Sequence, residues 1–245
     1  MGNLHDGHLS LIKEALSFND HVVVSIYVNP LQFNNKDDLL NYPKTIKDDI
    51  NLLESVGCNS LFIPDSTILN NIKKIKAPDL ANTLCGNSRP GHFDGVLTIV
   101  NKLFSIVSPT RAFFGLKDFQ QLSIIKDFVK KNNLPIDIFS VDIQRSSEGL
   151  ALSSRNNLLS KDDLITAAEI YKALQDIKIN KDCLSSFFIE KKISYLTDIG
   201  FKIEYLEICN PDTLEKIQLP IGDKAIVVIA AFLGKVRLID NILIN

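Results

Sequence analysis

The sequence has few of the features that mark a membrane protein, a nucleic-acid-binding protein or a secreted protein. Its longest apolar run, residues 225–233, is far shorter than the ~20 residues that span a bilayer. The formal net charge of −2 favours neither nucleic acid nor an acidic membrane surface as a partner. The cysteines are widely scattered and form no CxxC pair. We therefore expect free thiols in a cytoplasmic protein.

Two well-known catalytic signatures are also missing from the sequence. There is no GxxxxGK[ST] motif, which excludes a P-loop, and no GxSxG motif, so nothing indicates a Ser-His-Asp hydrolase. No internal repeat or low-complexity segment is present. The chain has 245 residues, of which 45% are hydrophobic and 23% charged, as is typical of one large or two smaller globular domains.

Short apolar strands alternate with helical patterns over the first 145 residues. β-branched apolar runs bounded by turn residues predict buried parallel strands, and the alternation predicts an α/β fold with a doubly wound, Rossmann-like parallel sheet. The strands are expected at 21–28, 60–65, 111–115 and 135–143, and the helices at 43–57, 95–109 and 116–131.

The pattern changes after residues 151–160. Two helical segments, at about 162–177 and 183–199, precede three extended runs at 201–210, 224–234 and 235–244. Helices followed by successive strands predict a smaller α+β domain. We therefore expect one domain at residues 1–145 and a second at residues 146–245.

The segment HDGH places His5 and His8 around Gly7, at the start of an amphipathic run. An isolated pair of this kind is usually a helix cap and a surface histidine, and no third zinc ligand lies nearby at a suitable spacing. The functional interpretation is phosphate binding. Gly7 permits close approach of a ligand, the helix start offers N–H groups and a positive dipole end, and two imidazoles can donate to phosphate oxygens.

Polar residues follow the other strands, where ligands bind in a doubly wound sheet. Lys117 and Asp118 follow the strand at 111–115 and are either a solvated pair or a phosphate contact and a magnesium ligand. Gln32 and Gln121 are neutral amides that can bind hydroxyl or carboxylate oxygens. This set suggests a triphosphate site with Mg²⁺ beside a pocket for a small polar acid.

The loop sequence Ser153-Ser154-Arg155 is a common loop composition when taken alone. Beside a nucleotide, it would offer two hydroxyl donors and a guanidinium group to the β- and γ-phosphates. Together with the HxGH motif near the first helix, this loop resembles the arrangement in the HxGH nucleotidyltransferases.

Seven segments, in order along the chain, carry a more specific resemblance. They are MGNLHDGHLSLI, SIYVNPLQF, YPKTIKDD, SRPGHFDGVLTIVNKLF, GLKDFQQ, GLALSSRN and GKVRLIDN. Together they resemble the pantothenate synthetase (pantoate–β-alanine ligase) family over nearly the whole chain. The resemblance implies that pantoate attacks the α-phosphorus of ATP to give pantoyl adenylate and pyrophosphate. The amine of β-alanine then gives pantothenate and AMP.

The resemblance also implies roles for individual residues. Catalysis would involve His8, as proton donor, with His5 and Lys117. Asp118 would bind Mg²⁺, Gln32 and Gln121 would bind pantoate, and Gln32 would also border β-alanine. The ATP site would comprise Met1, Gly2, Asn3, Leu4, His5, Asp6, Gly7, His8, Gly115, Leu116, Lys117, Asp118, Gln144 (through its backbone), Leu152, Ser153, Ser154 and Arg155. Residues 146–245 would form a lid that keeps water from the adenylate, and the enzyme would be a homodimer.

Some points are open or depart from the family pattern. Arg89 and His92 form either a structural turn or a wall of the pantoate site. Leu116 replaces the acid of the usual Gly-Glu-Lys-Asp turn. Nothing precedes Met1, where the family has an apolar strand and Pro-Thr, so we expect the native product to start upstream.

Two other functions remain as alternatives at this stage. One is a nucleotidyltransferase that stops at the adenylyl product and lacks the ligation step. The other is a catalytically inactive nucleotide-binding or dimerisation module, which only the truncated start favours.

Overall fold

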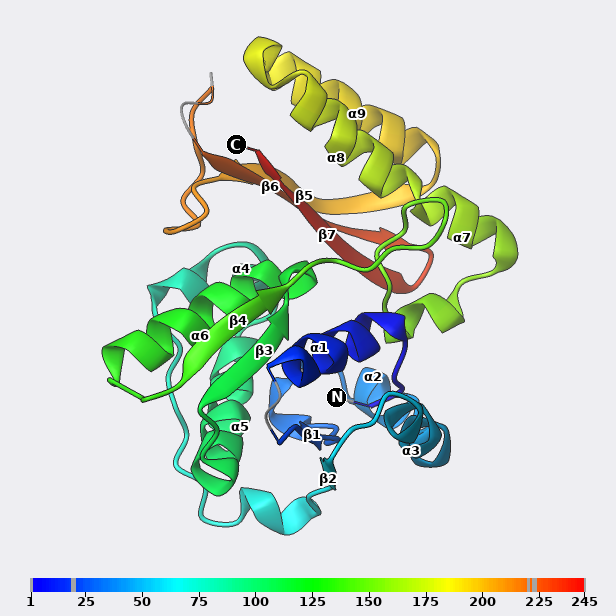
Figure 1. Cartoon of the computed structure of the whole chain (residues 1–245). Coiled ribbons are helices and arrows are strands. Elements are labelled where there is room, and N and C mark those ends of the chain that lie inside the picture. Colours follow the sequence, from blue (N-terminus) through cyan, green and yellow to red (C-terminus); the bar gives the residue numbers. More distant parts are fainter. Residues whose placement is uncertain (1, 19–20, 220, 222–223, 245) are drawn as a thin grey trace. The chain divides into compact units, whose positions relative to one another are not determined.

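The computed structural model describes residues 2–18, 21–219, 221 and 224–244. The chain divides into two compact units, which are described separately (Figure 1). Unit 1 comprises Met1–Leu116 and Gln120–Asp142, and unit 2 comprises Lys117–Phe119 and Ile143–Asn245. The short turn at Lys117–Phe119 therefore belongs with the C-terminal part of the chain, although it follows a strand of unit 1.

The first part of the chain alternates strands and helices, as the sequence predicts. The elements up to residue 107 are α1 (Asp6–Ser17), β1 (Val23–Ser25), η1 (Pro30–Gln32), α2 (Lys36–Leu40), α3 (Ile46–Ser55), β2 (Ser60–Phe62), η2 (Ser66–Leu69), η3 (Asp79–Asn82), α4 (Leu84–Ser88) and α5 (His92–Val107). They are followed by β3 (Arg111–Gly115), η4 (Leu116–Asp118), α6 (Phe119–Lys131) and β4 (Asp137–Val141).

The strands of unit 1 form two parallel pairs. β1 pairs with β2, with Val24 opposite Leu61, and β3 pairs with β4, with Phe113 opposite Phe139. The α/β class and the parallel strands are as expected. Over the described residues, however, the two pairs do not join into the single continuous sheet that the alternation predicts.

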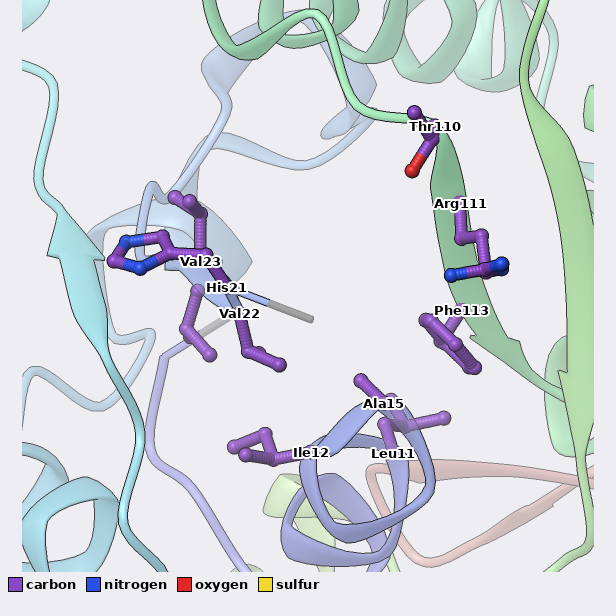
Figure 2. A pocket seen from close by; sticks show the side chains of 10 residues that line it. Leu11, Ile12, Ala15, His21, Val22, Val23, Thr110, Arg111 and Phe113 are labelled. Atoms are coloured by element: carbon purple, nitrogen blue, oxygen red, sulfur yellow. The ribbon is translucent and has the colours of Figure 1, made fainter. Parts of the chain in front are cut away.

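A groove of about 150 Å³ separates the two pairs of strands (Figure 2). Residues 21–24 form one wall, Thr110, Arg111 and Phe113 form the other, and the apolar face of α1 lies beside both. β1 pairs only with β2, and β3 only with β4, within the described chain. Within the described residues the parallel sheet is therefore interrupted at this groove.

The core of unit 1 is built on the apolar face of α1. Leu9, Ile12 and Ala15 are buried on this helix and pack with Val24 of β1 and Leu53 of α3. The spacing of the three α1 residues is that of one helix face. This packing fixes the start of α1, where the HxGH motif lies.

Unit 2 has a helical part followed by three strands. Its elements after the turn at Lys117–Phe119 are η5 (Ser154–Leu158), α7 (Lys161–Ala167), α8 (Glu169–Ile179), η6 (Lys181–Cys183), α9 (Ser186–Asp198), β5 (Phe201–Cys209), β6 (Ala225–Leu233) and β7 (Val236–Ile244). The three strands form an antiparallel sheet in the order β5-β6-β7, and α8 and α9 lie side by side over it (Figure 1). The expected meander of strands is confirmed.

The run AIVVIAAFL forms β6, the central strand of this sheet, and is almost entirely buried. Its side chains pack with Leu174 and Ile177 of α8 and Leu196 of α9, all of which are fully buried. The apolar run is therefore a core strand. None of the helices in the described ranges has the length and apolar character needed to cross a membrane.

Candidate active site

The two histidines of the HxGH motif cap the start of α1 reciprocally. The Gly7 N–H donates to Nδ1 of His5 (3.1 Å), and the His5 N–H donates to Nδ1 of His8 (3.3 Å). The ring centroids are 4.1 Å apart. Because each Nδ1 accepts a hydrogen bond, a neutral ring must carry its proton on Nε2. The motif therefore provides two N–H donors at a helix N-terminus.

Asp49 of α3 holds the backbone that leads into this motif. Its carboxylate accepts the N–H of Asn3 (3.0 Å) and the N–H of Leu4 (2.8 Å). Thr45 donates to the same carboxylate (3.1 Å), and Asp49 is only 2% exposed. Sequence reasoning missed Asp49. The available signal was its place between Ile46 and Leu53 on the apolar face of the predicted helix.

Gln32 lies on η1, beyond β1, and its side-chain amide has a defined orientation. Asn29 accepts the Leu31 N–H through Oδ1 (3.2 Å), so its Nδ2 is the donor to Oε1 of Gln32 (3.1 Å). The same Nδ2 donates to the carbonyl of Gly95 (3.0 Å). Because the oxygen of Gln32 faces Asn29, its Nε2 is the group that can donate to a ligand oxygen.

Arg89 and His92 contact the backbone of Gln32. His92 Nδ1 lies 2.8 Å from the carbonyl oxygen of Gln32, and Arg89 Nη2 lies 3.3 Å from it. Arg89 Nη1 and His92 Nε2 are 3.1 Å apart. Because Nδ1 of His92 faces a carbonyl oxygen, it must carry the ring proton. Nε2 of His92 then carries no proton and accepts a hydrogen bond from the Arg89 guanidinium. The pair thus supports Gln32 from its main-chain side.

Gly95 allows η1 to pack directly against α5. A Cβ atom at this position would lie 2.2 Å from the carbonyl oxygen of Leu31 and 2.8 Å from the backbone nitrogen of Gln32. Real atoms do not approach so closely, so any side chain here would displace the segment that carries Gln32.

The structure distinguishes the two adjacent glutamines at the start of α6. Gln120 is 7% exposed and donates to the carbonyls of Leu80 and Thr83, both at 2.8 Å. It therefore holds backbone within the protein. Gln121 is only half-buried, which leaves it accessible for the binding role that the sequence suggests.

Lys117 and Asp118 lie on η4, directly after β3. Lys117 is half-buried and Asp118 is exposed. The carbonyl of Lys117 accepts a hydrogen bond from Asn241 Nδ2 (3.0 Å). Among the residues that the structure describes, no three His, Cys, Asp or Glu side chains cluster closely enough to hold a metal ion. Asp118 is thus a single carboxylate beside a lysine.

The serine-containing loop of unit 2 is ordered by local hydrogen bonds. The Gln144 carbonyl accepts the Leu152 N–H (2.9 Å), and Arg145 bridges to Ala151 in an antiparallel arrangement. Ser153 caps η5 by accepting the Arg155 N–H (3.3 Å), and Ser154 is buried.

The predicted residues fall in both units. Unit 1 contains His5, His8, Gln32 and Gln121, together with Gly2–Gly7, Gly115 and Leu116; unit 2 contains Lys117, Asp118, Gln144 and residues 152–155. Met1 lies outside the described residues. The groove of Figure 2 is lined by none of these residues, so the chemistry is expected at the helix and strand ends.

An α/β unit with paired histidine donors at a helix N-terminus is typical of a phosphate-handling enzyme. The family model described as pantoate-beta-alanine ligase matches residues 1–243. The chain belongs to this family of amide-forming ligases.

Individual relatives agree with the family match. Pantothenate synthetase from Acinetobacter baylyi is 44% identical over 249 residues, which cover 99% of this chain and 88% of the relative. The crystal structure of pantothenate synthetase from Thermus thermophilus has a TM-score of 0.93 at 34% identity and covers 99% of this chain and 90% of that one. The pantoate-beta-alanine ligase of Francisella tularensis, solved with beta-gamma ATP and beta-alanine, has a TM-score of 0.83 at 39% identity, with 99% and 87% covered.

Proposed function

We propose that this chain ligates pantoate and β-alanine to pantothenate, using ATP and releasing AMP and pyrophosphate. The family match over residues 1–243 is the observation that carries the proposal. In the first step, a pantoate carboxylate oxygen attacks the α-phosphorus, and the bond from phosphorus to pyrophosphate breaks. In the second, the β-alanine nitrogen attacks the acyl carbon and loses a proton, and AMP leaves.

The HxGH motif suits the first step. Charge builds on the phosphate oxygens as the bond to pyrophosphate breaks. The Nε2–H groups of His5 and His8 lie at a positive helix end, where donors stabilise such charge. In this proposal, His8 also donates a proton, Lys117 contacts the phosphates, and Gly2–Gly7 with Gly115 and Leu116 line the nucleotide. The ATP site also includes Gln144 and residues 152–155 of unit 2.

Gln32 and Gln121 are proposed to bind pantoate, and Gln32 also to border β-alanine. The oriented Nε2 of Gln32 can donate to a hydroxyl or carboxylate oxygen without forming an ion pair. A carboxylate held by neutral amides keeps more of its nucleophilicity than one paired with a cation. Arg89 and His92 then serve this pocket by supporting Gln32.

Asp118 is the proposed protein ligand of Mg²⁺. Mg²⁺ usually takes one or two carboxylates, with phosphates and water as its remaining ligands, so one exposed carboxylate beside Lys117 fits this mode. The ion would neutralise phosphate charge when bound.

Three broader features belong to the same proposal. Unit 1 is of the HxGH nucleotidyltransferase type, residues 146–245 act as a lid that protects the adenylate from water, and the enzyme is a cytoplasmic homodimer. Sedimentation measures the oligomeric state.

Exchange of labelled pyrophosphate into ATP tests the proposed reaction. We expect exchange with pantoate present and β-alanine absent, and none without pantoate. Normal pantothenate synthesis without exchange would overturn the free adenylate step. Exchange without pantothenate formation after β-alanine is added would favour the nucleotidyltransferase alternative, and no turnover at all would favour the inactive module.

A further inference from the structure

A buried ion pair in unit 2 joins β7 to the loop that leads into residues 152–155, which the proposed function assigns to phosphate binding. Arg145 Nη1 and Nη2 donate to the carboxylate of Asp240 at 2.6 and 2.9 Å. Asp240 is 5% exposed. Burial raises the pKa of this carboxyl group, and the Arg145 guanidinium opposes that rise. Two parallel N–H···O bonds give such a pair a defined geometry as well as energy.

Arg145 is itself fixed from the helical side. Its guanidinium carbon lies 3.6 Å from the centroid of the Tyr171 ring on α8. Nη1 also donates to the carbonyl of Gly149 (3.0 Å). Gly149 has φ +99°, and a Cβ atom there would lie 2.6 Å from Cδ1 of Tyr171. The loop from 145 to 151 therefore closes tightly over this ring, and residues 152–155 follow it directly.

Asp240 and Asn241 are neighbours on β7, so their side chains point to opposite faces of the sheet. Asp240 lies on the face that packs against α8, together with Leu238 and Ile244. Asn241 lies on the other face and donates from Nδ2 to the carbonyl of Lys117 (3.0 Å). Its backbone N–H donates to Asp240 Oδ1 (2.8 Å). The ion pair thus connects to the Lys117 turn through one residue.

We propose that Arg145, Asp240 and Asn241 are positioning residues that hold the Lys117–Asp118 turn and the Ser153–Arg155 loop in one fixed arrangement. This inference rests on the proposed function for its catalytic consequence. Asp240 and Asn241 are polar residues within the otherwise mostly apolar β7 strand. Their side chains bond to Arg145 and to the Lys117 carbonyl, which lie outside the sheet. Asn241 sets the main chain of Lys117, and Arg145 sets the loop that precedes Ser153.

Hydrogen exchange of the ligand-free protein tests the positioning directly. Asn241→Ala should speed amide exchange in peptides covering residues 116–119 and leave those covering 150–156 close to wild type. Asp240→Asn should speed exchange in both segments, because Arg145 loses its charged partner and the Asn241 N–H loses its carboxylate acceptor. The matched control is Arg237→Ala. Arg237 lies on β7 with Asp240 and Asn241, and the variant breaks its ion pair with Glu204 of β5, so neither segment should change.

Kinetics separate positioning from general stability. Asn241→Ala should lower the rate of pyrophosphate exchange at least tenfold. Its KM for pantoate and its Tm should both stay close to those of the Arg237→Ala variant. Unchanged amide exchange at 116–119 in Asn241→Ala would overturn the inference, whatever the kinetics. A wild-type enzyme without pantoate-dependent pyrophosphate exchange would instead overturn the proposed function and leave the amide-exchange result to decide the positioning.

Discussion

The carboxylate of Asp49 lies 2.8 Å from the backbone nitrogen of Leu4, and so ties α3 to the residue that precedes His5. The same carboxylate accepts the N–H of Asn3. Asn3 has φ +50°, in the left-handed region that Asn adopts more readily than most other residues. Asp49 therefore supports the HxGH motif through the backbone of Asn3 and Leu4, the two residues that precede His5.

Replacing Asp49 with Ala should destabilise the protein by roughly 3 kcal/mol. The variant leaves two backbone N–H groups without their carboxylate, and each unsatisfied buried donor costs about 1–3 kcal/mol. Urea unfolding measures the loss. Asn51→Ala, at an exposed position of the same helix, is the control and should change stability by less than about 0.5 kcal/mol. Equal unfolding midpoints for the two variants would contradict the role given to Asp49.

Gly95→Ala should weaken pantoate binding. The new methyl group would overlap the Leu31 carbonyl, so η1 must shift and Gln32 moves with it. We expect KM for pantoate to rise about tenfold, which corresponds to ~1.4 kcal/mol, while the affinity for ATP changes little. Ser105→Ala, at an exposed position on the same helix, should leave both constants unchanged. A larger effect on ATP than on pantoate would show that Gln32 does not belong to the acid pocket.

His8→Ala and Lys117→Ala should lower kcat by about a hundredfold to a thousandfold, or ~3–4 kcal/mol, as loss of one preorganised donor typically does. His8→Asn separates donation from capping. Its Oδ1 can replace Nδ1 as acceptor for the His5 N–H, but nothing replaces Nε2. This variant should keep the wild-type Tm and still lose kcat. A His8→Asn enzyme with more than half the wild-type kcat would remove His8 from the mechanism.

Cys209 should resist alkylation in the folded protein, whereas Cys183 should react. Burial raises the pKa of the Cys209 thiol to about 12, so at pH 8 about one molecule in ten thousand carries the reactive thiolate. Cys183 is exposed. Mass spectrometry after iodoacetamide treatment at pH 8 should find Cys183 modified first. The thiolate population of Cys209 should grow as the pH rises toward 12. Cys183→Ser should abolish the fast phase, and equal rates at the two cysteines would contradict the burial argument.

Much of the secondary structure follows from local patterns. The apolar run at 111–115 forms β3 with the predicted bounds, and 225–233 forms the central strand β6. Local sequence patterns predict the ends of an element less well where pairing with a distant segment sets those ends. The strand predicted at 21–28 is reduced to Val23–Ser25, the part that pairs with β2. The helix predicted at 162–177 is divided at Ala168 into α7 and α8, although neither Gly nor Pro marks the break.

The sequence by itself determined the α/β class of the first part, the antiparallel strands of the second and the family. Apolar periodicity and motif order are local properties that one chain displays in full. Only the tertiary structure decided which polar residues support the site. Asp49 reaches Leu4 across 45 positions, and Asn241 reaches Lys117 across 124. Such hydrogen bonds depend on how distant segments pack, so the residue types alone do not reveal them.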